Sequence, residues 1–232
     1  MKKKLLRIFI AILFILGLGI LLYPTISEWL TQWMQKGRID TYQEQVQKLK
    51  DAECDRLFAE AQAYNEALVR EDISFENIES GRETLKEQGL DYEKLLNVDN
   101  NGMMGYITIH KIDLTLPISH GQSEKVLKYG VGHLEGSSLP VGGESTHAVL
   151  FGHRGLPSAK LFTDLDQLEI GDRIEIHVLN RTLTYEVDQI LVVEPEETDA
   201  LQIVEGQDYV TLVTCTPYGV NSHRLLIRAI RV

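Results

Sequence analysis

The sequence predicts a mainly β domain, either a closed barrel or a sandwich, that follows a helical region and an apolar N-terminal segment. Short alternating segments separated by turn residues fill the second half of the chain, and two further segments are continuously apolar, as buried strands are. Many short strands with few helices are typical of a barrel or a sandwich. The 232 residues are enough for one such domain plus appendages.

Residues 1–36 are expected to form a cytoplasmic basic tail, a transmembrane anchor and an interfacial segment. A cluster of basic residues precedes sixteen apolar residues, Ile8 to Tyr23, and Pro24 ends the run. This length approaches the roughly 20 apolar residues that span a bilayer. Basic residues before an apolar run place the N-terminus inside and the rest of the chain outside. A cleaved signal peptide would need a small-x-small site, which residues 21–25 do not offer convincingly; cleavage stays open.

Residues 37–104 are expected to form a helical arm and an acidic linker. Apolar side chains recur at three- and four-residue steps from Tyr42 to Leu68, which predicts one long helix over residues 37–70. Residues 71–104 are acidic and less regular. The arm is either a solvated stalk or an appendage packed on the domain that follows.

Residues 105–232 are expected to form the β domain. Strands are predicted over residues 106–109, 114–118, 147–151, 173–178, 183–187, 209–213 and 224–232. Short helices are predicted over residues 123–129 and 159–168.

The charge distribution argues against nucleic acid as a partner. Four of the 23 basic side chains lie in the first 23 residues, so the remainder carries 19 basic against 34 acidic side chains. Phosphate binding needs a basic face, which this remainder lacks. The pattern suits a soluble domain held off an anionic surface.

Three residues form a set suited to thiol acyl transfer. Cys215 ends an apolar, β-branched run and opens into a Pro-Tyr-Gly loop, a strand–loop junction where reactive side chains usually sit. His153 lies between glycines in a turn-like setting, and Arg224 follows nine residues after the cysteine. A neighbouring cation favours the thiolate nucleophile, a histidine exchanges protons, and a fixed guanidinium stabilises developing negative charge.

Two neighbouring expectations concern Thr214 and Cys54. Thr214 precedes Cys215, and its hydroxyl is expected to bond either the substrate or the adjoining loop. Cys54 falls in the predicted helix, where a small apolar residue packed on one face is expected. A disulfide between the two cysteines would consume the nucleophile, so free thiols are predicted.

No cofactor or metal is expected. The chain has no phosphate-binding glycine loop, no HExxH and no CxxC pattern. An acidic cluster lacks the spacing of an EF-hand calcium loop, so a solvated helix end is predicted there. The cluster consists of Asp164, Asp166, Glu169 and Asp172.

The segments around these residues resemble sortases, the Gram-positive surface-protein transpeptidases. They are TLVTC at 211–215, GHRG at 152–155 and NSHRLL at 221–226. The longer string TLVTCTPYGVNSHRLL resembles the class C, pilus-assembling sortases. The resemblance covers roughly Tyr106 to Val232, and more weakly the helical region before it. It implies an eight-stranded sortase-type β-barrel with Cys215 as nucleophile, His153 as general acid and base, and Arg224 as oxyanion or backbone partner.

The resemblance also implies a membrane-anchored, extracellular cysteine transpeptidase. Such an enzyme cleaves an LPxTG-like sorting signal between Thr and Gly, forms a thioacyl enzyme and, in class C, transfers the acyl group to a pilin lysine to build a covalent pilus. Its partners would be pilins or surface proteins that carry the signal. Three alternatives remain: a housekeeping sortase that anchors proteins to peptidoglycan, a non-catalytic membrane-anchored pilin scaffold, and a cysteine protease with water as acceptor.

Two features depart from class C. Its members usually carry an Asp-Pro-aromatic lid before the barrel, and residues 37–104 contain no proline. Many also end in a C-terminal transmembrane helix, whereas this chain stops at Val232 after a strand. An unlidded or differently lidded enzyme with a single N-terminal anchor is therefore expected.

Overall fold

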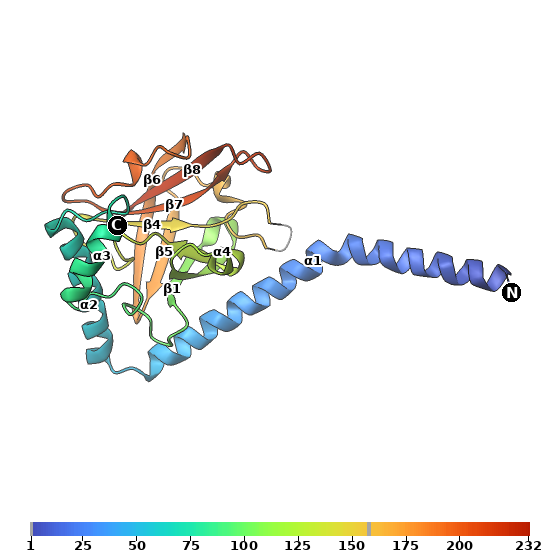
Figure 1. The fold of residues 1–232 in the computed structure, drawn as a ribbon, viewed down its shortest axis with the longest axis horizontal. Coiled ribbons are helices and arrows are strands. Elements are labelled where there is room, and N and C mark those ends of the chain that lie inside the picture. Colours follow the sequence, from blue (N-terminus) through green and yellow to red (C-terminus); the bar gives the residue numbers. More distant parts are fainter. Residues whose placement is uncertain (1, 157–158) are drawn as a thin grey trace.

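The computed structural model describes residues 2–156 and 159–232 and has a closed barrel of eight strands at its centre (Figure 1). This confirms the predicted mainly β barrel. The order around the barrel is β1-β2-β3-β4-β7-β8-β6-β5. The strands are β1 Met103–Ile109, β2 Leu114–His120, β3 Val131–His133, β4 Thr146–Phe151, β5 Arg173–Val178, β6 Arg181–Val193, β7 Asp208–Thr216 and β8 His223–Arg231.

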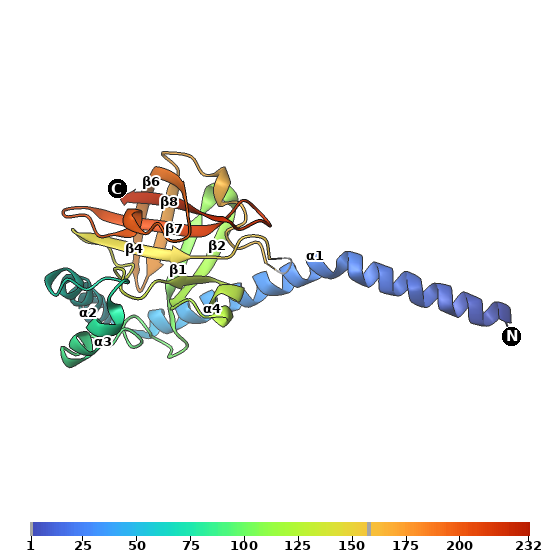
Figure 2. The same ribbon diagram turned by 45° about the horizontal axis from the view of Figure 1, so that its top comes forward.

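Helices lie at one end of the barrel, along its side and beyond its other end. They are α1 Lys2–Lys48, α2 Asp51–Arg70, α3 Ile78–Glu87 and α4 Glu124–Tyr129, with short 3-10 turns η1 His110–Ile112, η2 Leu165–Gln167 and η3 Asp199–Leu201. Both views show α2 and α3 together at one end of the barrel, while α1 runs along the barrel and extends far beyond its opposite end (Figures 1 and 2).

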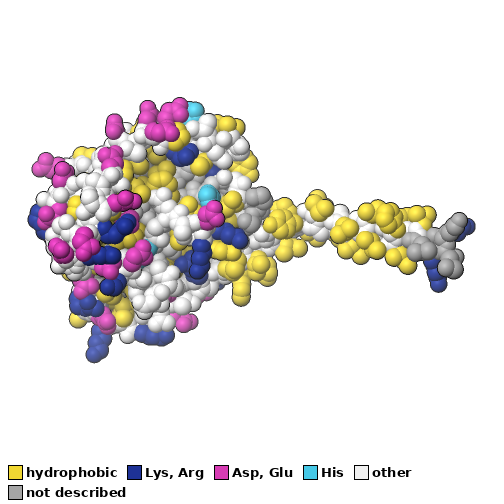
Figure 3. Space-filling view, viewed as in Figure 1, with side chains coloured by type: hydrophobic (Ala, Val, Ile, Leu, Met, Phe, Trp, Pro, Cys, Tyr) yellow, Lys and Arg dark blue, Asp and Glu magenta, His cyan; other side chains and the backbone are white. Residues whose placement is uncertain are grey.

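α1 has an apolar half and a half that packs on the barrel. Exposed hydrophobic side chains line the projecting half, as the face drawn in Figure 3 shows, and among the described residues α1 is the one helix long and apolar enough to cross a membrane. Pro24 lies inside α1, and a proline removes a helix hydrogen bond, which accounts for the bend between the halves. The buried positions recur at three- and four-residue steps: Thr31, Gln35, Ile39, Tyr42 and Val46.

Tyr42 fastens this second half of α1 to the barrel. Its hydroxyl donates to the carbonyl oxygen of Met104 at 2.9 Å and accepts from the backbone N–H of Leu179 at 2.8 Å. The helix is continuous through the boundary predicted between residues 36 and 37. The predicted membrane segment and the first part of the predicted arm therefore belong to one continuous helix, α1.

Two helix predictions were wrong. The helix predicted over residues 37–70 is broken: α1 ends at Lys48, Lys50 is extended, and α2 begins at Asp51. The break lets the buried face of α2 turn onto the barrel. Residues 159–168 form turns and the short η2 rather than one helix, because the backbone N–H of Phe162 bonds the carbonyl of His153 across the loop. The helix predicted over residues 123–129 is confirmed as α4.

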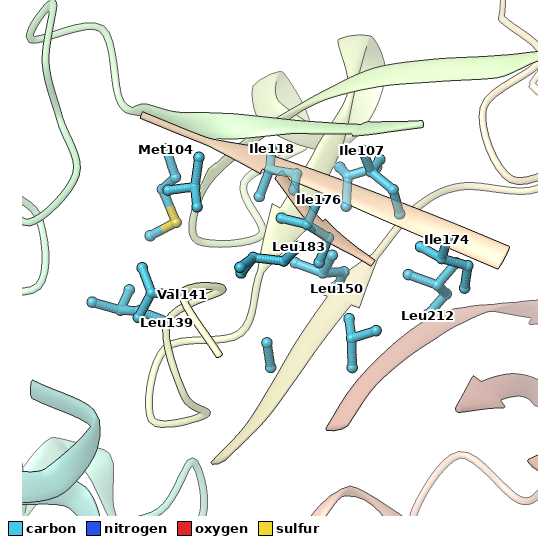
Figure 4. Packing of buried hydrophobic residues seen from close by; sticks show 14 of the residues in the cluster. Met104, Ile107, Ile118, Leu139, Val141, Leu150, Ile174, Ile176, Leu183 and Leu212 are labelled. Carbon is cyan, nitrogen blue, oxygen red and sulfur yellow. The ribbon is translucent and has the colours of Figure 1, made fainter. Parts of the chain in front are cut away.

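Strands β4 and β7 lie between two apolar layers. Inside the barrel, side chains from facing strands interdigitate around Leu150 of β4 and Leu212 of β7 (Figure 4). On the outside, Val149 and Val213 pack in a second cluster with Leu226 of β8. Burial on both faces explains the continuously apolar sequence of these two strands.

Residues 71–104 pack at the end of the barrel where β4 begins. Arg82 forms a two-bond ion pair with Glu135, with both distances 2.9 Å. Glu76 accepts hydrogen bonds from Thr198 and Gln202, in the segment that leads to β7. The arm is thus an appendage packed on the barrel, which is one of the two forms expected for it.

Two histidines are buried in the wall beside this appendage. Nδ1 of His133 lies 3.0 Å from the Tyr92 hydroxyl, and Nε2 lies 2.8 Å from a backbone carbonyl oxygen. Nδ1 of His147 lies 2.8 Å from the carbonyl oxygen of Gln202, and Nε2 lies 2.7 Å from the Thr211 hydroxyl. Burial lowers the pKa of each ring from 6.5 to about 4. Both rings are therefore neutral at neutral pH.

Acid is expected to destabilise the fold between pH 6.5 and about 4. In that window the unfolded chain protonates both rings and the folded chain does not, so the free energy of unfolding falls as the pH falls. The loss is roughly 3 kcal/mol for each ring across the window. Urea unfolding of the detergent-solubilised chain, at neutral pH and near pH 5, measures it. His147→Asn should reduce the pH dependence, and an unchanged dependence would contradict this account.

Candidate active site

Cys215 and Arg224 face each other on neighbouring strands. β7 lies between β4 and β8 in the barrel, and Cys215 is paired with Arg224 in the antiparallel β7–β8 ladder. Directly opposed residues project on the same face of a sheet. The preceding outward pair is Val213 with Leu226, which belongs to the outer apolar cluster. Cys215 and Arg224 therefore emerge on the outer face, at the end of β7.

His153 lies on the opposite side of Cys215 from Arg224, just after the end of β4. β4 and β7 are parallel, and the last pair in register is Phe151 with Val213. The backbone N–H of Gly152 donates to the carbonyl oxygen of Val213 at 3.1 Å, which continues the pairing beyond β4. Two residues beyond the Phe151–Val213 pair, this register places His153 level with Cys215. The strand register thus places the three predicted residues in one row across the neighbouring ends of β4, β7 and β8, with the cysteine in the middle.

Thr214 locks the histidine-bearing loop to β7. It is buried, and its hydroxyl donates to the carbonyl oxygen of Gly152 at 2.8 Å. Because alternate residues of a strand point to opposite faces, Thr214 points away from the face that carries Cys215. Of the two roles expected for this hydroxyl, the bond to the adjoining loop is the one present here.

Arg224 is held by the turn that precedes it. Its Nη1 donates to the carbonyl oxygen of His223 at 3.1 Å and to that of Asn221 at 3.3 Å. His223 lies 3.1 Å from the carboxylate of Glu194. Arg228, further along β8, forms a two-bond ion pair with Asp188.

Arg154 is the residue that sequence reasoning left without a role. Its side chain is only 8% exposed. One guanidinium nitrogen donates to the hydroxyl of Thr216, directly after Cys215, at 3.0 Å, and another pairs with Asp166. Arg154 therefore ties the histidine loop to the cysteine loop and to η2. Its position next to His153 was the only signal in the sequence.

The four carboxylates of the acidic cluster form ion pairs with Lys and Arg side chains rather than being only solvated. Asp166 pairs with Arg154, and Asp164 lies 2.9 Å from Nζ of Lys160. Glu169 and Asp172 share the Lys111 ammonium, each at 2.8 Å. Within the part of the chain that the structure describes, no group of three or more His, Cys, Asp and Glu side chains is arranged to hold a metal ion.

Gly152→Ala is expected to disturb the site and weaken the fold. A Cβ there would lie 2.5 Å from Cδ2 of the fully buried Phe162, so the ring or the His153 loop must move. Overpacking of this kind costs about 1–3 kcal/mol. Thermal unfolding measures the loss. Gly37→Ala, at a helical glycine with open space around it, is the control and should be neutral or stabilising. Equal stability of Gly152→Ala and the parent chain would contradict the packing argument.

The β-barrel matches known proteins in sequence and in structure. The sequence profile of the sortase domain matches residues 107–232. The crystal structure of sortase C1 from Streptococcus agalactiae shares 48% sequence identity at a TM-score of 0.76, over 84% of this chain and 97% of that chain. Sortase C from Streptococcus pneumoniae shares 41% identity at a TM-score of 0.72, over 84% and 96%.

Curated relatives match over a shorter stretch. Sortase A from Streptococcus agalactiae serotype III (strain NEM316) is 30% identical over 121 residues, which are 50% of this chain and 48% of that protein. The chain spans about half the length of the curated relatives it matches. The matched profile covers more than half of the chain and contains His153, Cys215 and Arg224. The chain belongs to the sortase family.

Proposed function

We propose that this chain is a cysteine transpeptidase that cleaves LPxTG-like sorting signals and transfers the acyl group to a lysine amine of a pilin. The observation that carries the proposal is the row of His153, Cys215 and Arg224 across the neighbouring ends of β4, β7 and β8. A nucleophile between a proton carrier and a guanidinium is the arrangement that acyl transfer through a thioester needs.

In the first half-reaction the Cys215 thiolate attacks the carbonyl carbon of the Thr–Gly bond. A carbon–sulfur bond forms, and negative charge develops on the carbonyl oxygen, where the Arg224 guanidinium stabilises it. The carbon–nitrogen bond then breaks, and His153 gives its proton to the leaving glycine amine. The products are a thioacyl enzyme at Cys215 and a released peptide with a free N-terminus.

In the second half-reaction the incoming amine attacks the thioester. His153 takes a proton from the attacking nitrogen, a new amide bond forms, and the carbon–sulfur bond breaks to return the Cys215 thiolate. Thr214 and Arg154 act here as positioning residues, because they hold the histidine and cysteine loops together without reaching the reacting atoms.

A pilin lysine is the favoured acceptor because the chain is similar to class C sortases over most of its length. The Streptococcus pneumoniae structure is described in terms of pilin substrate specificity, and this chain is 41% identical to it over 84% of its own length. The 30% identity to a sortase A supports the second candidate, attachment of surface proteins to peptidoglycan, over half of this chain. The similarity to class C sortases covers more of this chain and has the higher sequence identity, so it favours pilus assembly.

The apolar half of α1 supports a single-pass membrane anchor with the barrel outside the cell. Its side chains are exposed on all sides, and the basic residues precede it. The appendage formed by residues 71–104 contacts the end of the barrel where β4 begins, whereas the site lies where β4 ends. Phe75 of this appendage also packs against the outer apolar cluster of Val213 and Leu226, the pair that precedes Cys215 and Arg224 on the same face, so the appendage covers part of the surface that leads to the site. This supports the differently lidded form of the enzyme.

A transfer assay tests the proposal. The full chain in detergent is incubated with an LPxTG peptide and one of two amines: a lysine-containing pilin fragment or a peptidoglycan cross-bridge peptide. Mass spectrometry is expected to detect a thioacyl adduct at Cys215 and an isopeptide product with the pilin fragment. Preference for the cross-bridge amine would favour the housekeeping role. Hydrolysis that neither amine diverts would favour a protease.

A further inference from the structure

The end of the barrel that carries the site points toward the apolar half of α1. Both ribbon views show β4 and β7 ending on the side toward which α1 projects, with α2 and α3 on the opposite side (Figures 1 and 2). The contacts along α1 agree. Tyr42 meets the start of β1, whereas Thr31, nearer the N-terminus, lines a cavity of about 730 Å³ with the β1–β2 turn at His110 and Asp113.

The catalytic loop is fastened to that same turn. Nζ of Lys160 donates to the carbonyl oxygen of Ile112 at 2.9 Å, and the backbone N–H of Phe162 donates to the carbonyl of His153 at 3.1 Å. These bonds place the loop that begins at His153 beside the β1–β2 turn. The site is therefore at the end of the barrel nearest the apolar half of α1.

The helix leaves little space between this end and a bilayer. The apolar run ends at Tyr23, and the first α1 residue buried against the barrel is Thr31. Eight residues at a rise of 1.5 Å correspond to about 12 Å. The headgroup layer of one leaflet is roughly 5–8 Å thick. An α1 that spans the membrane upright holds the barrel within about one headgroup thickness of the lipid surface, and tilt brings it closer.

Exposed aromatic and aliphatic side chains gather at this end. On α1, Trp29 is 66% and Trp33 is 65% exposed. In the β7–β8 loop directly after the nucleophile, Tyr218 is 59% and Val220 is 69% exposed. Tyr218 packs against Gly155, where an added Cβ would lie 2.8 Å from its ring, so the loop stands beside the histidine loop. Trp and Tyr are enriched at headgroup level.

We propose that the β7–β8 loop, residues 217–222, rests on the surface of the membrane that holds α1, with Tyr218 and Val220 in contact with the lipid headgroups. The inference rests on the membrane anchor proposed above, since the exposed apolar side chains of α1 and of this loop lie at the same end of the barrel. Its consequence is that the site opens toward the membrane plane and takes its sorting signal from there. The partner is the lipid bilayer itself.

Tryptophan fluorescence tests the contact, because Trp29 and Trp33 are the only tryptophans of the chain. The full chain carrying Trp29→Phe, Trp33→Phe and Tyr218→Trp is placed in bilayers that contain a lipid with a quencher near its headgroup. The matched control carries Val204→Trp in the same background. Val204 is 45% exposed and precedes β7, at the opposite end of the barrel. We expect quenching several-fold stronger for Tyr218→Trp than for Val204→Trp.

The native tryptophans distinguish a failure of the membrane anchor from a failure of the loop contact. If Trp29 and Trp33 of the parent chain are not quenched, the membrane anchor itself is wrong. If they are quenched but the two reporters respond equally, α1 is anchored and the loop contact is overturned. Should Tyr218→Trp disturb the loop, as a lower melting temperature would reveal, Val220→Trp reports on the same contact.

Discussion

Replacement of Cys215 by alanine is expected to abolish transfer, with a rate loss of more than about 10⁴-fold. In the proposed mechanism the Cys215 thiolate forms the covalent intermediate, and no other described residue in the row of His153, Cys215 and Arg224 carries a nucleophilic sulfur. Mass spectrometry of this variant should no longer detect enzyme whose mass is increased by the acyl fragment of the LPxTG peptide. Because Cys215 is half-buried at a strand end, the substitution should leave the melting temperature nearly unchanged.

Cys54→Ala is the matched control. Cys54 is the other free cysteine, buried on α2, and burial followed by nearby carboxylates raises the pKa of its thiol. A buried neutral thiol packs like a small apolar group and does not attack a carbonyl. The Cys54→Ala chain should keep its transfer rate and lose about 1 kcal/mol of stability. If pili or isopeptide products still form with Cys215→Ala, the chain is a scaffold and the transpeptidase proposal fails.

The strands were predictable because their patterns are local. The alternating pattern of β5 predicted a strand over residues 173–178, which are its bounds in the structure. The continuous apolar run of β7 indicated a strand that is buried on both faces. β3 escaped prediction because its three residues, Val131–His133, form too short a run to alternate. It exists because β2 and β4 each need a partner between them, which is a property of the closed barrel rather than of the segment.

The break between α1 and α2 could not be predicted for a similar reason. Leu49 and Lys50 are ordinary helix formers, and no proline or glycine marks the position. The chain turns there so that α2 packs on the same β5–β6 turn that Tyr42 bonds through Leu179: Cys54 lies beside Leu179, and the Phe58 ring lies under Arg181. Tertiary packing overrides the local preference in this case.

The site was found from the sequence only through its resemblance to a family. Cys215 and Arg224 are nine residues apart, a spacing that allows a hairpin pair but does not fix the register. His153 is 62 residues before Cys215, and nothing local links them. Their adjacency follows from the parallel β4–β7 register. The contacts of Arg154 with Thr216 and Asp166 depend on three loops meeting, so no sequence pattern could have indicated them.

Replacement of Arg224 by alanine is expected to lower kcat about 10²–10³-fold with a smaller change in KM, the usual cost of removing a group that stabilises an oxyanion. The structure favours this role because Arg224 is paired across the ladder with Cys215 and its guanidinium is held against two backbone carbonyls. Arg224→Lys should recover only part of the rate, since an ammonium keeps the charge but not the planar set of donors.

Arg228→Ala separates this role from a merely structural one. Arg228 stands four residues further on β8, pairs with Asp188 through bonds of 3.1 and 2.7 Å, and stacks 4.3 Å over the Tyr209 ring. Its removal should lower the melting temperature while leaving kcat near that of the parent chain, and Arg224→Ala should do the reverse. Steady-state rates and thermal unfolding of both variants decide the matter. Equal losses of kcat in the two variants would mean that Arg224 supports the strand pair rather than the transition state.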